Sequence, residues 1–107
     1  MTAKEKVLLQ KVKSNLILQH DQDDALLLGH IAAAVSYAET YQHKKAGTYK
    51  TKAMLPTTEQ GVIMLASHFY ESRDGSTGGF FGDNVGASAN VWQTVNRLLV
   101  LDREVKL

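Results

Sequence analysis

A glycine-rich run, GSTGGFFGDNVG at residues 75–86, is the stretch of this sequence that most resembles a site of chemistry. A P-loop binds phosphate between a strand and a helix, and its last glycine is followed by lysine and then serine or threonine. This run contains no lysine, and the residues before it have helical spacing. Gly79 and Gly82 supply only part of the dinucleotide-binding pattern G-x-G-x-x-G. The run therefore predicts a loop between two helices and not a phosphate site.

Two adjacent phenylalanines, Phe80 and Phe81, lie within this glycine-rich run. An exposed phenylalanine forgoes about 1.5–3 kcal/mol of burial free energy, so this pair needs a partner surface. The two side chains either fold back on the core of their own subunit or contact another chain. The residues alone leave both alternatives open.

The acidic cluster DQDD at residues 21–24 does not match a calcium-binding EF-hand loop. Counting from Asp21, the fifth and sixth positions are Ala25 and Leu26, where the loop needs an oxygen ligand and a glycine. Aspartates suit a helix N-terminus, where their oxygens accept free backbone N–H groups. The four histidines lack the H-x-x-x-H and H-E-x-x-H spacings of zinc sites, and there is no cysteine. We expect neither a metal nor another cofactor.

The charged residues outside that cluster do not form a catalytic pattern. Glu71, Arg73 and Asp74 have no accompanying nucleophile, so we predict ion pairs within or between subunits and no enzymatic activity. The lysines of residues 44–52 could contact nucleic acid, but the formal net charge is only +1 and no array of stacking aromatics accompanies them. A solvated loop is the better interpretation of this segment.

The elements that must position these residues are helices. The 107 residues, 44% of them apolar, suit a single domain over residues 1–107 with one modest core. The predicted fold class is all-α, a small bundle of four helices with the long glycine-rich loop before the last. No segment reads as a signal peptide or a membrane span. Apolar positions at three- and four-residue spacing place the helices at about residues 4–15, 22–42, 57–74 and 88–101.

Several helix ends also carry sequence signals. Pro56 suits a helix start, and Thr57 and Gln60 have the spacing of a capping box. Gly75 is expected to end that helix and Ser88 to cap the next.

The connecting segments give weaker signals. Gly29 and the alanines after it leave room for another helix to pack closely against residues 22–42. Residues 43–53 have no clear period and are expected to form a surface loop, partly extended. The residues LLVL at 98–101 fit the end of a helix or a short strand.

Three segments, in this order, resemble one family: DQDDALLLGHIAAAVSYAETY, LPTTEQGVIMLASHFYESRD and VNRLLVLDRE. They are similar to the small head–tail connector proteins, also called head-completion or adaptor proteins, of long-tailed phages and prophages. The resemblance covers about residues 5–103. Its most specific pieces are DDALL, HFYESR and the closing Leu98, Leu99 and Arg103. None of these pieces is a catalytic signature, and the glycine-rich run has no counterpart in the resemblance.

The resemblance implies a structural virion protein that forms an oligomeric ring of about twelve copies beneath the portal protein. Such a ring bridges the portal and a tail or head-closure protein, and it extends the DNA channel. The protein would assemble in the host bacterial cytoplasm and reside at the head–tail junction, without cofactors or a membrane. The alternative is a small DNA-binding or DNA-packaging protein. Arg73 and Arg97 are the single basic residues of their helices apart from histidine, which disfavours a recognition helix.

Two groups of residues are expected to carry assembly. The predicted subunit interface pairs the charged end of the third helix with two phenylalanine anchors in a loop that neighbouring subunits would order. It comprises Glu71, Arg73, Asp74, Phe80 and Phe81. The predicted portal-docking surface is the terminal segment, which carries both charge signs and apolar residues. It comprises Asp102, Arg103, Val105, Lys106 and Leu107.

Overall fold

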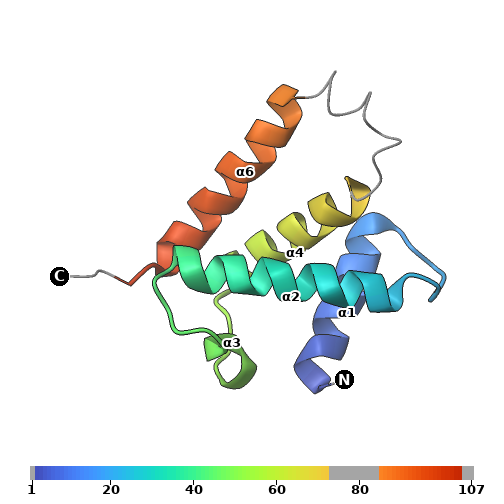
Figure 1. The fold of residues 1–107 in the computed structure, drawn as a ribbon, viewed down its shortest axis with the longest axis horizontal. Helices are drawn as coiled ribbons and strands as arrows, with labels where there is room; N and C mark the ends of the chain where they lie inside the picture. The colour runs from blue at the N-terminus through green and yellow to red at the C-terminus, as the bar shows by residue number, and fades with distance from the viewer. Residues whose placement is uncertain (1, 73–84, 105–107) are drawn as a thin grey trace.

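A computed structural model describes residues 2–72 and 85–104 of the chain (Figure 1). Every regular element in these two segments is helical, which confirms the predicted all-α class. None of the helices in them is long and apolar enough to cross a bilayer. The elements are α1 (Ala3–Leu16), α2 (Asp24–Tyr41), α3 (Thr48–Thr51), α4 (Pro56–Glu71), α6 (Val85–Leu99) and the 3-10 helix η2 (Val100–Asp102).

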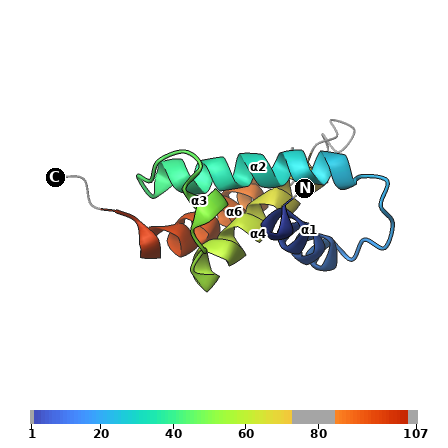
Figure 2. The same ribbon diagram turned by 90° about the horizontal axis from the view of Figure 1, so that it is seen from below.

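The helices form two layers around one hydrophobic core. Figure 2 shows α2 along one side, with α6, α4 and α1 beneath it. The apolar faces that the sequence predicts for the two central helices meet in this core, because each repeats at helical spacing. The fully buried side chains of the core include Val12, Leu27, Ala38, Val62, Leu65, Ala66 and Val95.

The first helix is fixed at both ends by local hydrogen bonds. The Glu5 backbone N–H donates to the Thr2 hydroxyl oxygen (3.1 Å), and the Thr2 N–H donates to the Glu5 carboxylate (3.3 Å). This reciprocal capping box satisfies two free donors of the first turn. At the other end Ile17 takes a left-handed conformation, with φ 59° and ψ 41°. The Leu18 N–H then donates to the carbonyl of Lys13 at 2.9 Å and closes the helix.

A buried ammonium group joins α1 to the start of α2. Lys13 is only 5% exposed, and its Nζ lies 2.5 Å from Asp21 Oδ1 and 2.9 Å from Asp24 Oδ1. Asp23 occupies the N-cap position of α2 but makes no side-chain capping bond. Instead, it accepts a hydrogen bond from the Tyr70 hydroxyl of α4. The prediction that these aspartates cap the helix through their side chains is wrong, because their oxygens bind partners on other helices.

The start of α4 confirms one sequence signal and corrects another. Pro56 is the first helical residue, as predicted, but the N-cap is Leu55 and makes no side-chain bond. Thr57 and Gln60 therefore lie inside the helix, and the predicted capping box is wrong. Further along the helix, a Cβ at Gly61 would lie 3.2 Å from Leu99 Cδ2, so this glycine permits the close approach of α6. The helix ends at Glu71, and the predicted stop at Gly75 lies outside the described residues.

Other boundaries also differ from the prediction. The last long helix begins at Val85, which places Ser88 within it and not at its cap. The segment 43–53 contains the short helix α3, which follows Gly47 at a φ of 87°. The residues LLVL are helical, as the end of α6 and the start of η2, so the strand alternative is wrong.

The predicted close packing at Gly29 does not occur among the described residues. Gly29 is exposed, and a Cβ built there would meet nothing within 4 Å. Ala32 and Ala33, on the same helix, are also exposed. The face of α2 that carries Gly29, Ala32 and Ala33 therefore has no helix packed on it within the described part of the subunit, whereas Ala34 is buried in the core.

Replacing Lys13 with methionine tests the buried ion group. Its partner Asp21 has its pKa lowered below the usual value of 3.8, first by the hydrogen bond from Lys13 and then by the charge of Lys13. The stabilisation by this pair is therefore present above pH 3.8 and is lost as the pH falls through the lowered pKa. We expect Lys13→Met to lower the unfolding temperature at pH 7, and the difference from wild type to shrink in acid. Thermal unfolding followed by circular dichroism measures this, and a difference independent of pH would contradict it.

Candidate functional site

A buried glutamine immediately after α2 joins the ends of four elements. Gln42 has no solvent exposure, and its Nε2 donates to Thr58 Oγ1 and to the Leu99 carbonyl, both at 2.9 Å. Its Oε1 accepts a hydrogen bond of 2.5 Å from the Tyr49 hydroxyl. These four residues, here called the Gln42 cluster, come from α3, α4, α6 and the residue that follows α2. Each of them finds its partner on a different segment of the chain.

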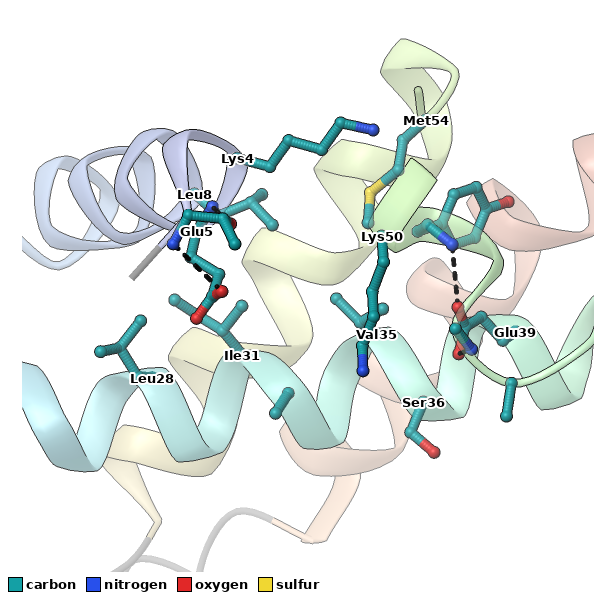
Figure 3. Close-up of a pocket in the computed structure, with 15 residues that line it drawn as sticks. Lys4, Glu5, Leu8, Leu28, Ile31, Val35, Ser36, Glu39, Lys50 and Met54 are labelled. Atoms are coloured by element: carbon teal, nitrogen blue, oxygen red, sulfur yellow. Dashed lines mark hydrogen bonds between the residues drawn. The ribbon is translucent and has the colours of Figure 1, made fainter. Parts of the chain in front are cut away.

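A carboxylate on α2 holds the α3 side of this cluster. Glu39 accepts the Gly47 N–H at 3.1 Å with one oxygen and the Tyr49 N–H at 3.0 Å with the other. Figure 3 draws Glu39 and these bonds beside α3. The bonds satisfy free donors at the start of α3, where negative charge is also favoured. Glu39 thereby positions Tyr49 to reach Gln42.

The C-terminal segment is fastened to the same region by backbone and imidazole hydrogen bonds. The Glu104 N–H donates to the Gln42 carbonyl at 2.8 Å. The Nδ1 of His43 lies 3.1 Å from the Glu104 carbonyl, and its Nε2 lies 2.9 Å from Arg103 Nη2. Because arginine can only donate, Nε2 accepts, and Nδ1 carries the proton that is donated to Glu104. We call residues 102–104 the C-terminal latch.

Charged side chains reinforce this latch. The Arg103 guanidinium lies over the Tyr41 ring, 4.8 Å from its centroid, within the range of a cation–π interaction. The Nζ of Lys44 lies 3.6 Å from carboxylate oxygens of both Asp102 and Glu104. The latch therefore holds Asp102 and Arg103 against their own subunit.

A groove runs between α1, α2 and α3 (Figure 3). Its volume is about 590 Å³, and a hollow of about 290 Å³ adjoins it beside α1. The lining on α2 extends from Leu28 to Glu39, which corresponds to about 16 Å along a helix. The floor is apolar and comprises Leu8, Leu28, Ile31, Val35 and Met54.

The carboxylates around the groove form hydrogen bonds within the subunit, whereas three nearby lysines form no salt bridge in the described segments. Its two carboxylates, Glu5 and Glu39, both accept backbone N–H groups. Lys4 and Lys50 at the groove and Lys52 at the adjoining hollow form no salt bridge within the described segments. The groove thus combines an apolar floor with lysines that form no salt bridge in the described segments.

Comparison with protein-family models gives a match over residues 6–103, to the family described as phage gp6-like head–tail connector proteins. The chain belongs to this family. The match spans α2, α4, α6 and most of the latch, and it agrees with the sequence resemblance, which covered residues 5–103. Comparisons with curated proteins and with solved structures gave no significant match. The connector is a structural phage protein of the head–tail junction.

The described part of the connector contains one of the five residues predicted to form the subunit interface. Glu71 lies exposed at the last position of α4. The other four, Arg73, Asp74, Phe80 and Phe81, lie outside the described residues, so the structure does not test this grouping.

The predicted portal-docking surface is also only partly described. Asp102 ends η2 and Arg103 follows it, both within the latch. Val105, Lys106 and Leu107 lie outside the described residues. The exposed Val100 and Leu101 precede the latch and were not among the residues predicted to form this surface.

Sequence reasoning missed the Gln42 cluster, although one signal was present. Gln42 follows Ala38 by four residues, so it continues the spacing of the buried face of α2 as a polar residue at a core position. Such a residue needs buried hydrogen-bond partners. The sequence does not indicate that these partners come from three other elements.

The Gln42 cluster predicts a large effect from a single substitution. Gln42→Leu leaves the Tyr49 hydroxyl, the Thr58 hydroxyl and the Leu99 carbonyl without this partner. We expect the free energy of unfolding to fall by about 3 kcal/mol, because buried polar groups that lose their partners pay a desolvation penalty. Urea denaturation measures this. The control is Gln10→Leu on the exposed face of α1, expected within about 0.5 kcal/mol of wild type. Equal effects of the two substitutions would contradict the prediction.

Tyr49 predicts a distinct alkaline transition. Burial, followed by the charge of Asp102, raises the pKa of Tyr49 from 10.0 to about 12. The folded state therefore favours the neutral phenol. The stabilisation of the folded state by the neutral Tyr49 phenol is complete below pH 10 and is lost as the pH rises through 12. We expect Tyr49→Phe to be less stable than wild type below pH 10 but to lose less stability between pH 10 and 12. Parallel alkaline denaturation curves for the two proteins would overturn this assignment.

Proposed function

We propose that this connector forms a ring at the head–tail junction, bridges the portal and a tail or head-closure protein, and lengthens the DNA channel. The family match over residues 6–103 carries the proposal. A ring of identical subunits needs two different complementary patches on each subunit, and about twelve copies would match a twelve-fold portal. The whole chain acts as one structural domain, without catalysis or a cofactor. It assembles in the host bacterial cytoplasm and then resides in the virion.

The latch supports the portal side of this proposal. By binding Gln42, His43 and Lys44, residues 102–104 fix the point and direction in which the chain leaves the subunit. Val105, Lys106 and Leu107 follow that point, and we propose that they contact the portal. Leu101, just before the latch, is 65% exposed and would add apolar area to the portal contact. Asp102 and Arg103 contribute by holding the exit in place.

The subunit interface keeps its predicted membership in this proposal. Glu71 is exposed at the end of α4, where it can reach a neighbouring subunit. Arg73 and Asp74 would pair across the same boundary. Phe80 and Phe81 would anchor the glycine-rich segment on that neighbour.

Native mass spectrometry over a concentration series tests ring formation, alone and with the portal added. We expect an assembly of about a dozen subunits, either from the connector alone or when the portal is present. A connector that stays monomeric and does not bind the portal would overturn the proposed function.

A substitution at Leu101 tests the portal surface. We expect Leu101→Asp to weaken binding to the portal about tenfold or more, because a charge would replace buried apolar area. The matched control is Thr94→Asp, which adds the same charge at an exposed position of α6. Both variants should keep the wild-type unfolding temperature to within a few degrees, since both sites are exposed. Equal portal affinities of the two variants would exclude Leu101 from the contact.

A further inference from the structure

Lys4 and Lys50 form no salt bridge within the described part of the subunit. Glu5 lines the same groove, and its pKa is lowered by hydrogen bonds with Thr2 and, to a smaller extent, by the charge of Lys50. Lys4 projects from the start of α1, and Lys50 extends from α3 over the groove beside Val35 (Figure 3). Both carboxylates of the groove are already bonded to backbone N–H groups. An occupant that placed apolar side chains on the floor and carboxylates near these lysines would therefore be complementary to the groove.

The segment between α1 and α2 has the matching composition. We call residues 17–26 the 17–26 loop; it includes the first turn of α2. Three carboxylates, at Asp21, Asp23 and Asp24, are opposed by the single ammonium of Lys13, which leaves a local negative charge. The Asp21 side chain is 86% exposed.

The same loop exposes two apolar side chains. Ile17 is 82% exposed, and Leu26 is 42% exposed. The loop therefore combines apolar and acidic groups on one surface segment. Figure 1 shows the loop at the right-hand end of the molecule, whereas α3 and the start of α1, which border the groove, lie at the bottom. None of the loop residues lines the groove, although the lining on α2 begins at Leu28, two residues after Leu26.

Ile17 is unusual in its backbone as well as in its exposure. Its φ of 59° lies in the left-handed region, where glycine is favoured and β-branched residues are rare. Backbone strain of this kind persists where the surrounding structure fixes the conformation, and here the hydrogen bonds that close α1 do so. Since the Ile17 side chain is exposed, its own subunit offers little burial to offset that strain.

We propose that the 17–26 loop of one connector subunit docks into the groove of a second copy. Ile17 and Leu26 cover the apolar floor, and Asp21 faces Lys4 and Lys50. The contact is head-to-tail, because a loop on one subunit meets a groove on the next, and this is the type of interface that closes rings. The inference rests on the proposed ring and names the surfaces that build it.

Cross-linking tests this contact directly, because the chain contains no cysteine to give a background. Ala32 lines the groove and is exposed, and Ala33 is exposed on the same helix but does not line the groove. A Gln22→Cys subunit, changed at an exposed position of the loop that leaves Ile17 in place, should form a heterodimer with an Ala32→Cys subunit and a short bismaleimide. Gln22→Cys mixed with Ala33→Cys should give at least about tenfold less product if docking is specific. A subunit carrying both Gln22→Cys and Ala32→Cys should give a ladder of oligomers.

Native mass spectrometry of the same samples, with and without the portal, separates this inference from the proposed function. A ring that forms while Ala32→Cys and Ala33→Cys cross-link equally, or not at all, overturns the docking but leaves the ring in place. Neither a ring nor a cross-link, with or without the portal, overturns both. A cross-link from Ala32→Cys to the portal in place of a second copy would assign the groove to the portal and overturn the docking.

A glycine at position 17 separates docking from folding. Ile17→Gly removes the side chain and fits the left-handed backbone without strain. We expect this variant to unfold at the wild-type temperature or higher, yet to associate at least about tenfold more weakly. Unchanged association would overturn the docking, and the unfolding temperature shows that the subunit remains folded.

Discussion

The burial of the Gln42 side chain constrains more of this structure than any other polar interaction among the described residues. An amide in the core is stable only when its donors and acceptor are all matched, because water cannot replace a missing partner. Gln42 therefore requires the ends of α2, α4 and α6, together with Tyr49 of α3, to meet at one place. The latch depends on the same place, since the Gln42 carbonyl receives the Glu104 N–H.

The helices could be predicted because their signal lies within each segment. The buried positions of α2 and α4 recur every three or four residues, and burial of that face dominates the stability of each helix. Helix ends were less predictable, because side chains suited to capping found better partners in space. Asp23 binds Tyr70 of α4, and Asp24 binds the buried Lys13 of α1. No local pattern reveals such pairings.

The two candidate surfaces, the C-terminal segment and the groove, also differ in how far the sequence predicts them. Resemblance to head–tail connectors drew attention to the C-terminal residues before any contact was known, and the structure places Asp102 and Arg103 in the latch. The groove could not be predicted from the sequence. Its floor combines residues of α1 and α2 with Met54 near α3, and each of them resembles an ordinary core residue within its own segment.

The latch also determines how the connector would bear a mechanical load. A pull on the chain beyond Glu104 would meet the hydrogen bond to the Gln42 carbonyl and the ion pair of Lys44 with Glu104 before it reached η2, whose last residue, Asp102, also pairs with Lys44. Tension at the C-terminus is thus passed to the end of α2, which packs against α4 in the core, and α6 is not unwound from its end. A load applied at the C-terminus would therefore reach the most deeply packed helices of the subunit first.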